Sequence, residues 1–227
     1  MTNNEILNEF NLNESKLNQF EQYKNLLQEW SKKMNLTSIT EDTEVYIKHF
    51  YDSLVLEKYL NKNIHLADVG TGAGFPGLPI KIAREDLIVD LIEPTTKRCT
   101  FLSQVVNDLK LENVNIINKR SEDLPDKLGF YDAITSRAVA SLNILLELSI
   151  PLLKVGGKMY ALKGSSFNEE IKESKNALKE LKCKVTNIYE FDLPLDLGHR
   201  AIIEIEKYAE TSKKYPRVYA KIKKQPL

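Results

Sequence analysis

The stretch Asp68-Val69-Gly70-Thr71-Gly72-Ala73-Gly74-Phe75-Pro76-Gly77 decides the fold of this chain. It follows the apolar run 64–67, which predicts a short buried strand, and precedes the run 78–83, which predicts the start of a helix. Glycines permit a tight turn with positive φ, and their missing Cβ lets a ligand approach the backbone. A strand, a glycine-rich turn and a helix in this order are typical of a nucleotide-binding loop.

The spacing of the glycines favours one class of nucleotide site over another. The dinucleotide fingerprint is G-x-G-x-x-G, and counting from Gly70 its third glycine would fall on Phe75. The chain instead places Asp68 two residues before Gly70, which is followed by Gly72 and Gly74. This pattern disfavours a nicotinamide oxidoreductase and resembles the first motif of S-adenosylmethionine-dependent methyltransferases.

Outward from this loop, the chain alternates between predicted strands and helices. Strands are expected at 64–69, 87–92, 114–117, 131–135, 158–162, 185–191 and 201–205, and helices at 95–109, 142–153 and 167–181. Gly156-Gly157 is expected to stop the second of these helices. The alternation predicts an α/β, Rossmann-like fold with a mostly parallel sheet and an antiparallel pair at one edge.

The two ends of the chain differ from this core domain, which we place at 63–207. Residues 1–62 carry apolar side chains at helical spacing and predict an N-terminal helical extension packed on the core. Residues 208–227 predict a basic C-terminal tail, in which 212–227 hold five lysines, one arginine and two tyrosines but no acid. The tail is either an RNA contact, whose removal leaves cofactor binding intact, or a solvated, disordered end.

Composition excludes several classes of protein. Lysine plus arginine equals aspartate plus glutamate, 32 each in 227 residues, so net charge alone predicts no partner. Cys99 and Cys183 lack zinc-site spacing, and we expect no metal site. The N-terminus does not resemble a signal peptide, and no run approaches the ~18 apolar residues of a membrane span. We therefore expect a cytoplasmic protein without membrane contact.

Ligands of such sheets bind at the carboxyl ends of the strands, so residues just after each strand are candidates. Glu93 ends the second strand, where an acid can accept both ribose hydroxyls, although a plain surface acid is the alternative. Ser121 and Glu122 follow the third strand, where they can contact an adenine edge, cap a helix, or do both.

The end of the fourth strand, Ser136-Arg137, is the usual place for catalytic residues in this fold. No Pro-Pro motif marks an amino-group methyltransferase, and no cysteine lies there to attack a base carbon. An acceptor with a free lone pair, such as a ring nitrogen, needs no general base, so positioning and electrostatics suffice. Arg137 can contact the base or the methionine carboxylate, and Lys163 either shares this face or is an exposed lysine.

The whole chain resembles the bacterial ribosomal RNA small-subunit methyltransferase G family, also called glucose-inhibited division protein B. The resemblance rests on 68–79, Ser136-Arg137-Ala138, 160–164, Asn35-Leu36-Thr37, Lys48-His49 and Asp52-Ser53-Leu54. It implies a class I methyltransferase fold with S-adenosyl-L-methionine as cofactor. It also implies methylation of guanine N7 in 16S ribosomal RNA, on the small ribosomal subunit near the decoding centre. We expect a monomer.

The resemblance also implies which residues form the site. Cofactor contacts are implied for Gly70, Phe75, Ser121, Glu122 and Arg137, to which the spacing arguments add Gly72, Gly74 and Glu93. Arg120, Arg137 and Lys163 would be the basic residues of the catalytic face. The alternative function is a non-catalytic RNA-binding protein that retains the fold, against which the intact glycine, ribose and adenine motifs argue.

Overall fold

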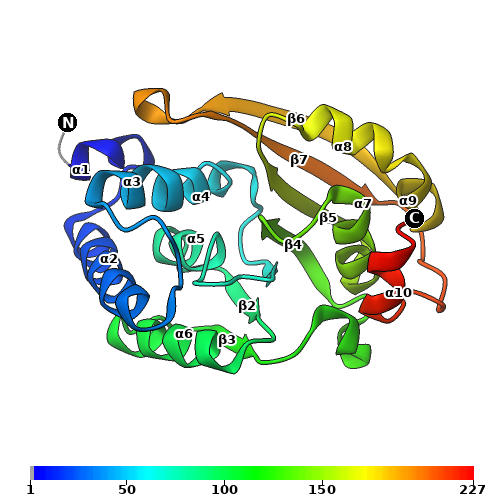
Figure 1. Ribbon diagram of the computed structural model, residues 1–227, viewed down its shortest axis with the longest axis horizontal. Coiled ribbons are helices and arrows are strands. Elements are labelled where there is room, and N and C mark those ends of the chain that lie inside the picture. Colours follow the sequence, from blue (N-terminus) through cyan, green and yellow to red (C-terminus); the bar gives the residue numbers. More distant parts are fainter. Residues whose placement is uncertain (1–2) are drawn as a thin grey trace.

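The computed structural model describes residues 3–227, which contain one mixed β-sheet (Figure 1). Its strands are β1 (His65–Val69), β2 (Ile88–Ile92), β3 (Val114–Ile117), β4 (Tyr131–Arg137), β5 (Leu153–Lys163), β6 (Cys183–Asp192) and β7 (His199–Lys207). They lie in the order β3-β2-β1-β4-β5-β7-β6. Strands β1 to β5 pair in parallel, whereas β7 is antiparallel to both β5 and β6. The predicted Rossmann-like sheet with an antiparallel edge pair is confirmed, and its order reverses between β1 and β4, where a ligand crevice is expected.

Helices cover both faces of the sheet. The core contributes α5 (Gly77–Ala83), α6 (Thr96–Asp108), α7 (Leu142–Ser149), α8 (Phe167–Glu173) and α9 (Lys175–Glu180), and the C-terminal segment contributes α10 (Tyr219–Lys224). Leu66 of β1 joins the hydrophobic cluster under α5 and α6, whereas its neighbour Ala67 joins the cluster under α7 and α9. This alternation is what a strand buried on both faces requires.

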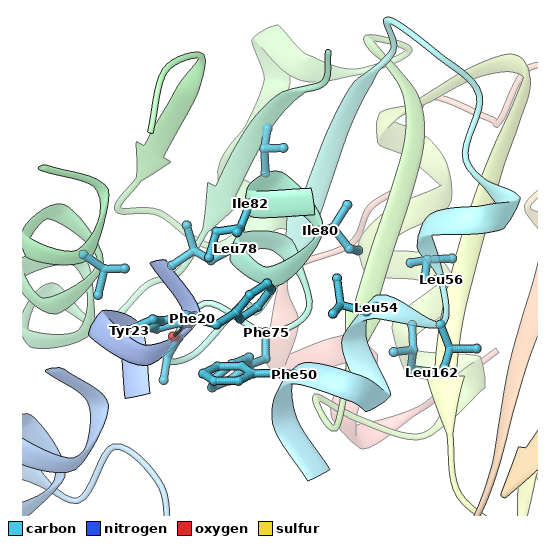
Figure 2. Close-up of a cluster of buried hydrophobic side chains, with 14 of the residues drawn as sticks. Phe20, Tyr23, Phe50, Leu54, Leu56, Phe75, Leu78, Ile80, Ile82 and Leu162 are labelled. Carbon is cyan, nitrogen blue, oxygen red and sulfur yellow. Dashed lines mark hydrogen bonds between the residues drawn. The ribbon is translucent and has the colours of Figure 1, made fainter. Parts of the chain in front are cut away.

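The N-terminal extension shares the first of these clusters. It comprises α1 (Asn3–Ile6), α2 (Glu14–Met34), α3 (Asp42–Val45), a π-helical segment (Tyr46–Tyr51) and α4 (Asp52–Leu54). Figure 2 shows Phe20, Tyr23 and Phe50 gathered around Phe75 of the glycine loop. The Tyr23 hydroxyl donates to the Ala73 carbonyl at 2.5 Å, so the extension supports the loop directly. A domain boundary near residue 62 remains a prediction.

The C-terminal segment 212–227 is folded against the core, which contradicts the idea of a solvated, disordered end. Tyr215 and Ile222 are buried, and α10 packs against α7. The Arg217 guanidinium donates to both carboxylate oxygens of Glu147, which is fully buried. The sequence could not show this because the partners are separated by 70 residues.

The expected role of Gly156-Gly157 as a helix stop is wrong. The helix α7 ends at Ser149, a 3₁₀ turn follows at Ile150–Leu152, and β5 begins at Leu153. Pro151 explains the early end, because proline cannot continue the helical hydrogen bonds. The glycines instead lie in a bulge of β5, where a Cβ on Gly157 would come within 3.0 Å of the Asp132 carbonyl oxygen.

The predicted helix at 167–181 forms, but it divides at Ser174 into α8 and α9. Within residues 3–227, no helix is both long and apolar enough to cross a membrane.

Candidate functional site

The glycine loop after β1 is held in its shape by Asp68. One carboxylate oxygen accepts from the Thr71 hydroxyl at 2.6 Å and from the Gly77 amide at 2.8 Å. Gly70 and Gly72 adopt φ of +71° and +62°, which other residues rarely adopt. Burial raises the pKa of the Asp68 carboxyl to about 6. Asp68 therefore shapes the loop from inside the protein.

In the described part of the chain, two adjoining cavities lie over the carboxyl ends of the strands. The larger has a volume of about 810 Å³ and the smaller about 340 Å³, and Gly70, Arg98, Ala138 and Val139 border both. Ala138 has φ of +56° and carries Val139 over the loop, where a Cβ on Gly70 would lie 2.5 Å from Val139 Cγ2. The arrangement suits an elongated ligand with two chemically different ends.

Arg137, at the end of β4, crosses the larger cavity and meets the N-terminal extension. Its Nη1 donates to Asp52 Oδ2 at 2.7 Å and to the Lys48 carbonyl at 3.0 Å. Its guanidinium lies over the Phe75 ring, 5.1 Å from the centroid. Charge-assisted hydrogen bonds to a buried carboxylate fix the side chain in one orientation.

His49 is a rigid part of the same wall. Its ring stacks on Phe75 with a centroid separation of 4.4 Å. Arg137 Nη2 lies 3.2 Å from His49 Nδ1, and a guanidinium can only donate, so Nδ1 accepts and the proton is on Nε2. His49 Nε2 then donates to the Thr37 hydroxyl at 3.0 Å. Burial and the adjacent Arg137 cation lower the pKa of His49 to about 3, so the ring is neutral.

Lys163 lies in the larger cavity as predicted, but it is 9% exposed and bound on two sides. Its ammonium donates to the Ala140 carbonyl and to Glu170 Oε2, each at 2.7 Å. Glu170 also accepts from the Leu142 amide at the start of α7. Lys163 therefore fixes the loop after β4, and the alternative of an exposed lysine is wrong.

Glu93 lies at the end of β2 and borders the smaller cavity. It is buried, with one carboxylate oxygen accepting from the Gly72 amide at 3.1 Å and the other from the Thr95 amide at 2.9 Å. Arg98 Nη1 approaches within 3.6 Å. The carboxylate thus joins the glycine loop to the end of β2, and it is not a plain surface acid.

The far end of the smaller cavity is formed by residues after β3. Ser121 and Glu122 border it within a 3₁₀ turn, Ser121–Asp123. Among the described residues, Glu122 Oε1 is buried and has no hydrogen-bond partner, and burial raises the pKa of its carboxyl. An unpaired buried oxygen is costly, and a donor on a ligand would satisfy it. Arg120 is half exposed beside it, with its guanidinium over the Tyr219 ring.

The structure divides the predicted site residues between the two cavities. Gly70, Gly72, Phe75, Arg137 and Lys163 border the larger one, and Gly70, Glu93, Arg120, Ser121 and Glu122 border the smaller. In the part of the chain that the structure describes, Gly74 borders neither. A Cβ there would lie 2.4 Å from Leu78 Cδ1, so packing explains this glycine.

Other residues of the site were not predicted as such. Thr37, Lys48, His49 and Asp52 enter the larger cavity from the extension, Arg200 enters from β7, and Tyr219 borders the smaller cavity. The available signal for the first four was their place in the family resemblance. Across residues 3–227, no cluster of histidine, cysteine, aspartate and glutamate is placed to hold a metal ion.

Solved structures with a similar fold include proteins that bind or use S-adenosylmethionine, at low sequence identity. M. jannaschii TYW2 in complex with AdoMet superposes with a TM-score of 0.58 at 17% identity, over 70% of this chain and 76% of that one. A SAM dependent methyltransferase from Aquifex aeolicus gives 0.57 at 18% identity, over 79% and 98%. These similarities show a Rossmann-like class I methyltransferase fold.

Sequence relatives identify the family. A family model described as rRNA small subunit methyltransferase G matches residues 16–203. Proteins named ribosomal RNA small subunit methyltransferase G from Clostridium botulinum and Staphylococcus saprophyticus are 45% and 44% identical. The matches cover 97% and 95% of this chain and 95% and 92% of those proteins. The chain therefore belongs to the ribosomal RNA small subunit methyltransferase G family.

Proposed function

We propose that this protein transfers a methyl group from S-adenosylmethionine to N7 of a guanine in 16S ribosomal RNA, on the small ribosomal subunit. Family membership supports methylation of ribosomal RNA. The observation that carries the proposal is the pair of joined cavities over the glycine loop. One is bordered by Glu122, whose Oε1 accepts no hydrogen bond among the described residues, and the other is bordered by Arg137, whose guanidinium is fixed by Asp52.

The residues present fit S-adenosylmethionine. Its adenosine end carries donors on the base and the ribose, which suit the carboxylates of Glu122 and Glu93 in the smaller cavity. Apart from Gly72 itself and its two neighbours in the chain, no heavy atom of the described residues lies within 4 Å of the Cβ position of Gly72, so this backbone is open to a ligand. Arg137 in the larger cavity suits the methionine carboxylate. The bound cofactor supplies an electrophilic methyl group on a positively charged sulfur.

The residues around the larger cavity are suited to positioning rather than proton transfer. Guanine N7 carries a free lone pair, so no side chain has to remove a proton from it. His49 agrees with this, since both of its ring nitrogens are already engaged. Methyl transfer moves one positive charge from sulfur to the base, so the main requirement is a fixed approach geometry.

We retain Arg137, Lys163 and Arg120 as the proposed basic residues of the catalytic face, with different roles. Arg137 directly borders the space for the reactants. Lys163 acts through the Ala140 carbonyl and is a positioning residue. Arg120 is half exposed and is suited to a phosphate of the incoming RNA.

We further propose that the protein acts as a monomer in the cytoplasm, where ribosomal subunits are its substrate. The non-catalytic alternative, an RNA-binding protein with this fold, has little support. A protein that only binds RNA does not need two joined cavities over an open glycine backbone.

The test is methyl transfer with cofactor labelled in the methyl group. Small subunits from a strain that lacks this methyltransferase should gain label in their 16S RNA, and large subunits should not. Arg137→Ala should abolish the incorporation, whereas Lys33→Ala, a change in an exposed ion pair on α2, should not. Cofactor binding without any incorporation would support the non-catalytic alternative.

A further inference from the structure

One wall of the smaller cavity comes from the C-terminal segment. Tyr219, the first residue of α10, borders this cavity together with Ser121 and Glu122. The match to the family model ends at residue 203, so Tyr219 lies beyond the matched part of the chain. The family match therefore does not explain why an aromatic ring borders this cavity.

Three contacts anchor the segment around Tyr219. Arg217, two residues earlier, forms a bidentate ion pair with the buried Glu147 of α7. Ile222 of α10 is fully buried, and the Tyr215 hydroxyl donates to Glu180 at 3.1 Å. The segment on both sides of Tyr219 is therefore anchored, which places the ring at the border of the cavity.

The surroundings of the ring suit a planar, aromatic ligand that carries hydrogen-bond donors. The Arg120 guanidinium lies over the Tyr219 ring, 5.1 Å from its centroid. Glu122 borders the same cavity, and among the described residues its Oε1 accepts no hydrogen bond, although Arg120 Nη1 lies 3.9 Å from it. A purine can pack on an aromatic ring while its exocyclic amine donates to a carboxylate.

We propose that Tyr219 packs against the adenine of S-adenosylmethionine, so that the docked C-terminal segment is part of the cofactor site. This inference rests on the proposed function. It replaces the expectation that the basic tail contacts RNA independently of the cofactor. Removal of the segment should therefore weaken cofactor binding.

The test is titration calorimetry with S-adenosylhomocysteine, which keeps the adenosine but has no methyl group to transfer. Stacking of a base on an aromatic ring predicts that Tyr219→Ala weakens binding by about tenfold. Tyr219→Phe keeps the ring and should bind like the wild type. Val218→Ala is the matched control, since Val218 is the neighbouring residue and is 71% exposed.

Kinetics and a second variant separate loss of the ring from loss of structure. In methyl-transfer assays, Tyr219→Ala should raise KM for S-adenosylmethionine while kcat stays near the wild-type value. Tyr219→Leu keeps an apolar side chain on α10 and should show the same loss of affinity. Each variant is measured well below its own melting temperature.

The outcomes distinguish the two proposals. A wild-type protein that does not bind S-adenosylhomocysteine contradicts the proposed function itself. If the wild type binds and Tyr219→Ala and Tyr219→Leu bind within twofold of it, the cofactor assignment stands and the role of Tyr219 is overturned.

Discussion

At the scale of single residues, two buried titratable groups hold the site in shape without exchanging protons with a substrate. Asp68 accepts hydrogen bonds from within the glycine loop, and His49 links Arg137 to Thr37. Their partners are backbone and side-chain groups of the protein itself. Both residues therefore hold other groups of the site in fixed positions. Methyl transfer to a free lone pair requires such positioning and no proton transfer.

The neutral His49 makes stability depend on pH. Its folded pKa of about 3 lies below the unfolded value, so the unfolded chain binds the extra proton as pH falls below about 6.5. Stability is therefore lost on acidification. The free energy of unfolding should fall by about 1 kcal/mol more in the wild type than in His49→Gln between about pH 7 and pH 5.5.

Denaturant titrations of both proteins across this range measure the difference. The raised pKa of Asp68 has the opposite effect, since protonation of its carboxyl favours the folded state, but it is common to both proteins and cancels. Parallel pH profiles for the two proteins would show that His49 is not held neutral.

A comparison of two glycines with similar positive φ can distinguish the effect of backbone strain from the effect of lost ligand contact. Gly72 has φ of +62° and Gly129 has φ of +64°, and apart from each glycine and its chain neighbours no heavy atom of the described residues lies within 4 Å of either Cβ position. Valine should strain both sites by about 1–3 kcal/mol. Only Gly72→Val should abolish S-adenosylmethionine binding in calorimetry, because Gly72 borders the larger cavity. Equal affinity of the two folded variants would refute the loop assignment.

At the scale of elements, the segment that leads into α10 is fixed by an ion pair between Arg217 and the buried Glu147 of α7. Glu147 is fully buried, and the segment presents both the amide and the guanidinium of Arg217 to it. Removing one partner of a buried pair leaves an uncompensated charge, which is costly. The C-terminal segment is therefore a structural element rather than an appendage.

Arg217→Ala should lower the free energy of unfolding by about 3 kcal/mol, since it leaves the Glu147 carboxylate buried without its cation. Lys224→Ala, an exposed change on α10, should cost less than about 0.5 kcal/mol. The double variant Glu147→Leu/Arg217→Leu should recover much of the loss, because it removes both charges. Thermal and denaturant unfolding measure the stability of all three variants. An Arg217→Ala protein as stable as the wild type would contradict the claim that the segment is docked through this ion pair.

The sequence predicts local elements well and their long-range contacts poorly. The glycine loop and the strand ends can be located from the spacing of glycines and apolar runs in the sequence. Gly72, Glu93 and Glu122 could therefore be predicted to lie at the carboxyl ends of the strands, and they border the two cavities. His49 lies in a helical segment whose apolar spacing does not show which face meets the sheet. Its contact with Arg137 joins residues 88 apart in the chain, and only packing of the extension determines it.

At the scale of the whole molecule, the extension and one face of the core share a hydrophobic cluster. Phe20, Tyr23 and Phe50 pack with Phe75 and Leu78, as Figure 2 shows. Because these side chains bury one another, separating the extension would expose this face of the sheet. We expect the extension and the sheet to unfold together.

Trp30, the one tryptophan of the chain, is a direct probe of this packing. It lies on α2 of the extension and contacts Phe101 of α6, with ring centroids 5.7 Å apart. Tryptophan fluorescence should report the same denaturation midpoint as circular dichroism of the whole protein. A fluorescence transition at lower denaturant would show that the extension separates from the core first.

The central claim is that this site methylates a ring nitrogen of guanine. N7 methylation leaves a positive charge on the base, which makes the ring and the glycosidic bond labile to borohydride and aniline. The decisive measurement is primer extension along 16S RNA after methylation by the protein and treatment with both reagents. We predict one new strand break, at a guanine, that depends on S-adenosylmethionine and is absent with Arg137→Ala. Labelled RNA without a new break, and with the label on an exocyclic amine or a base carbon, would contradict the account.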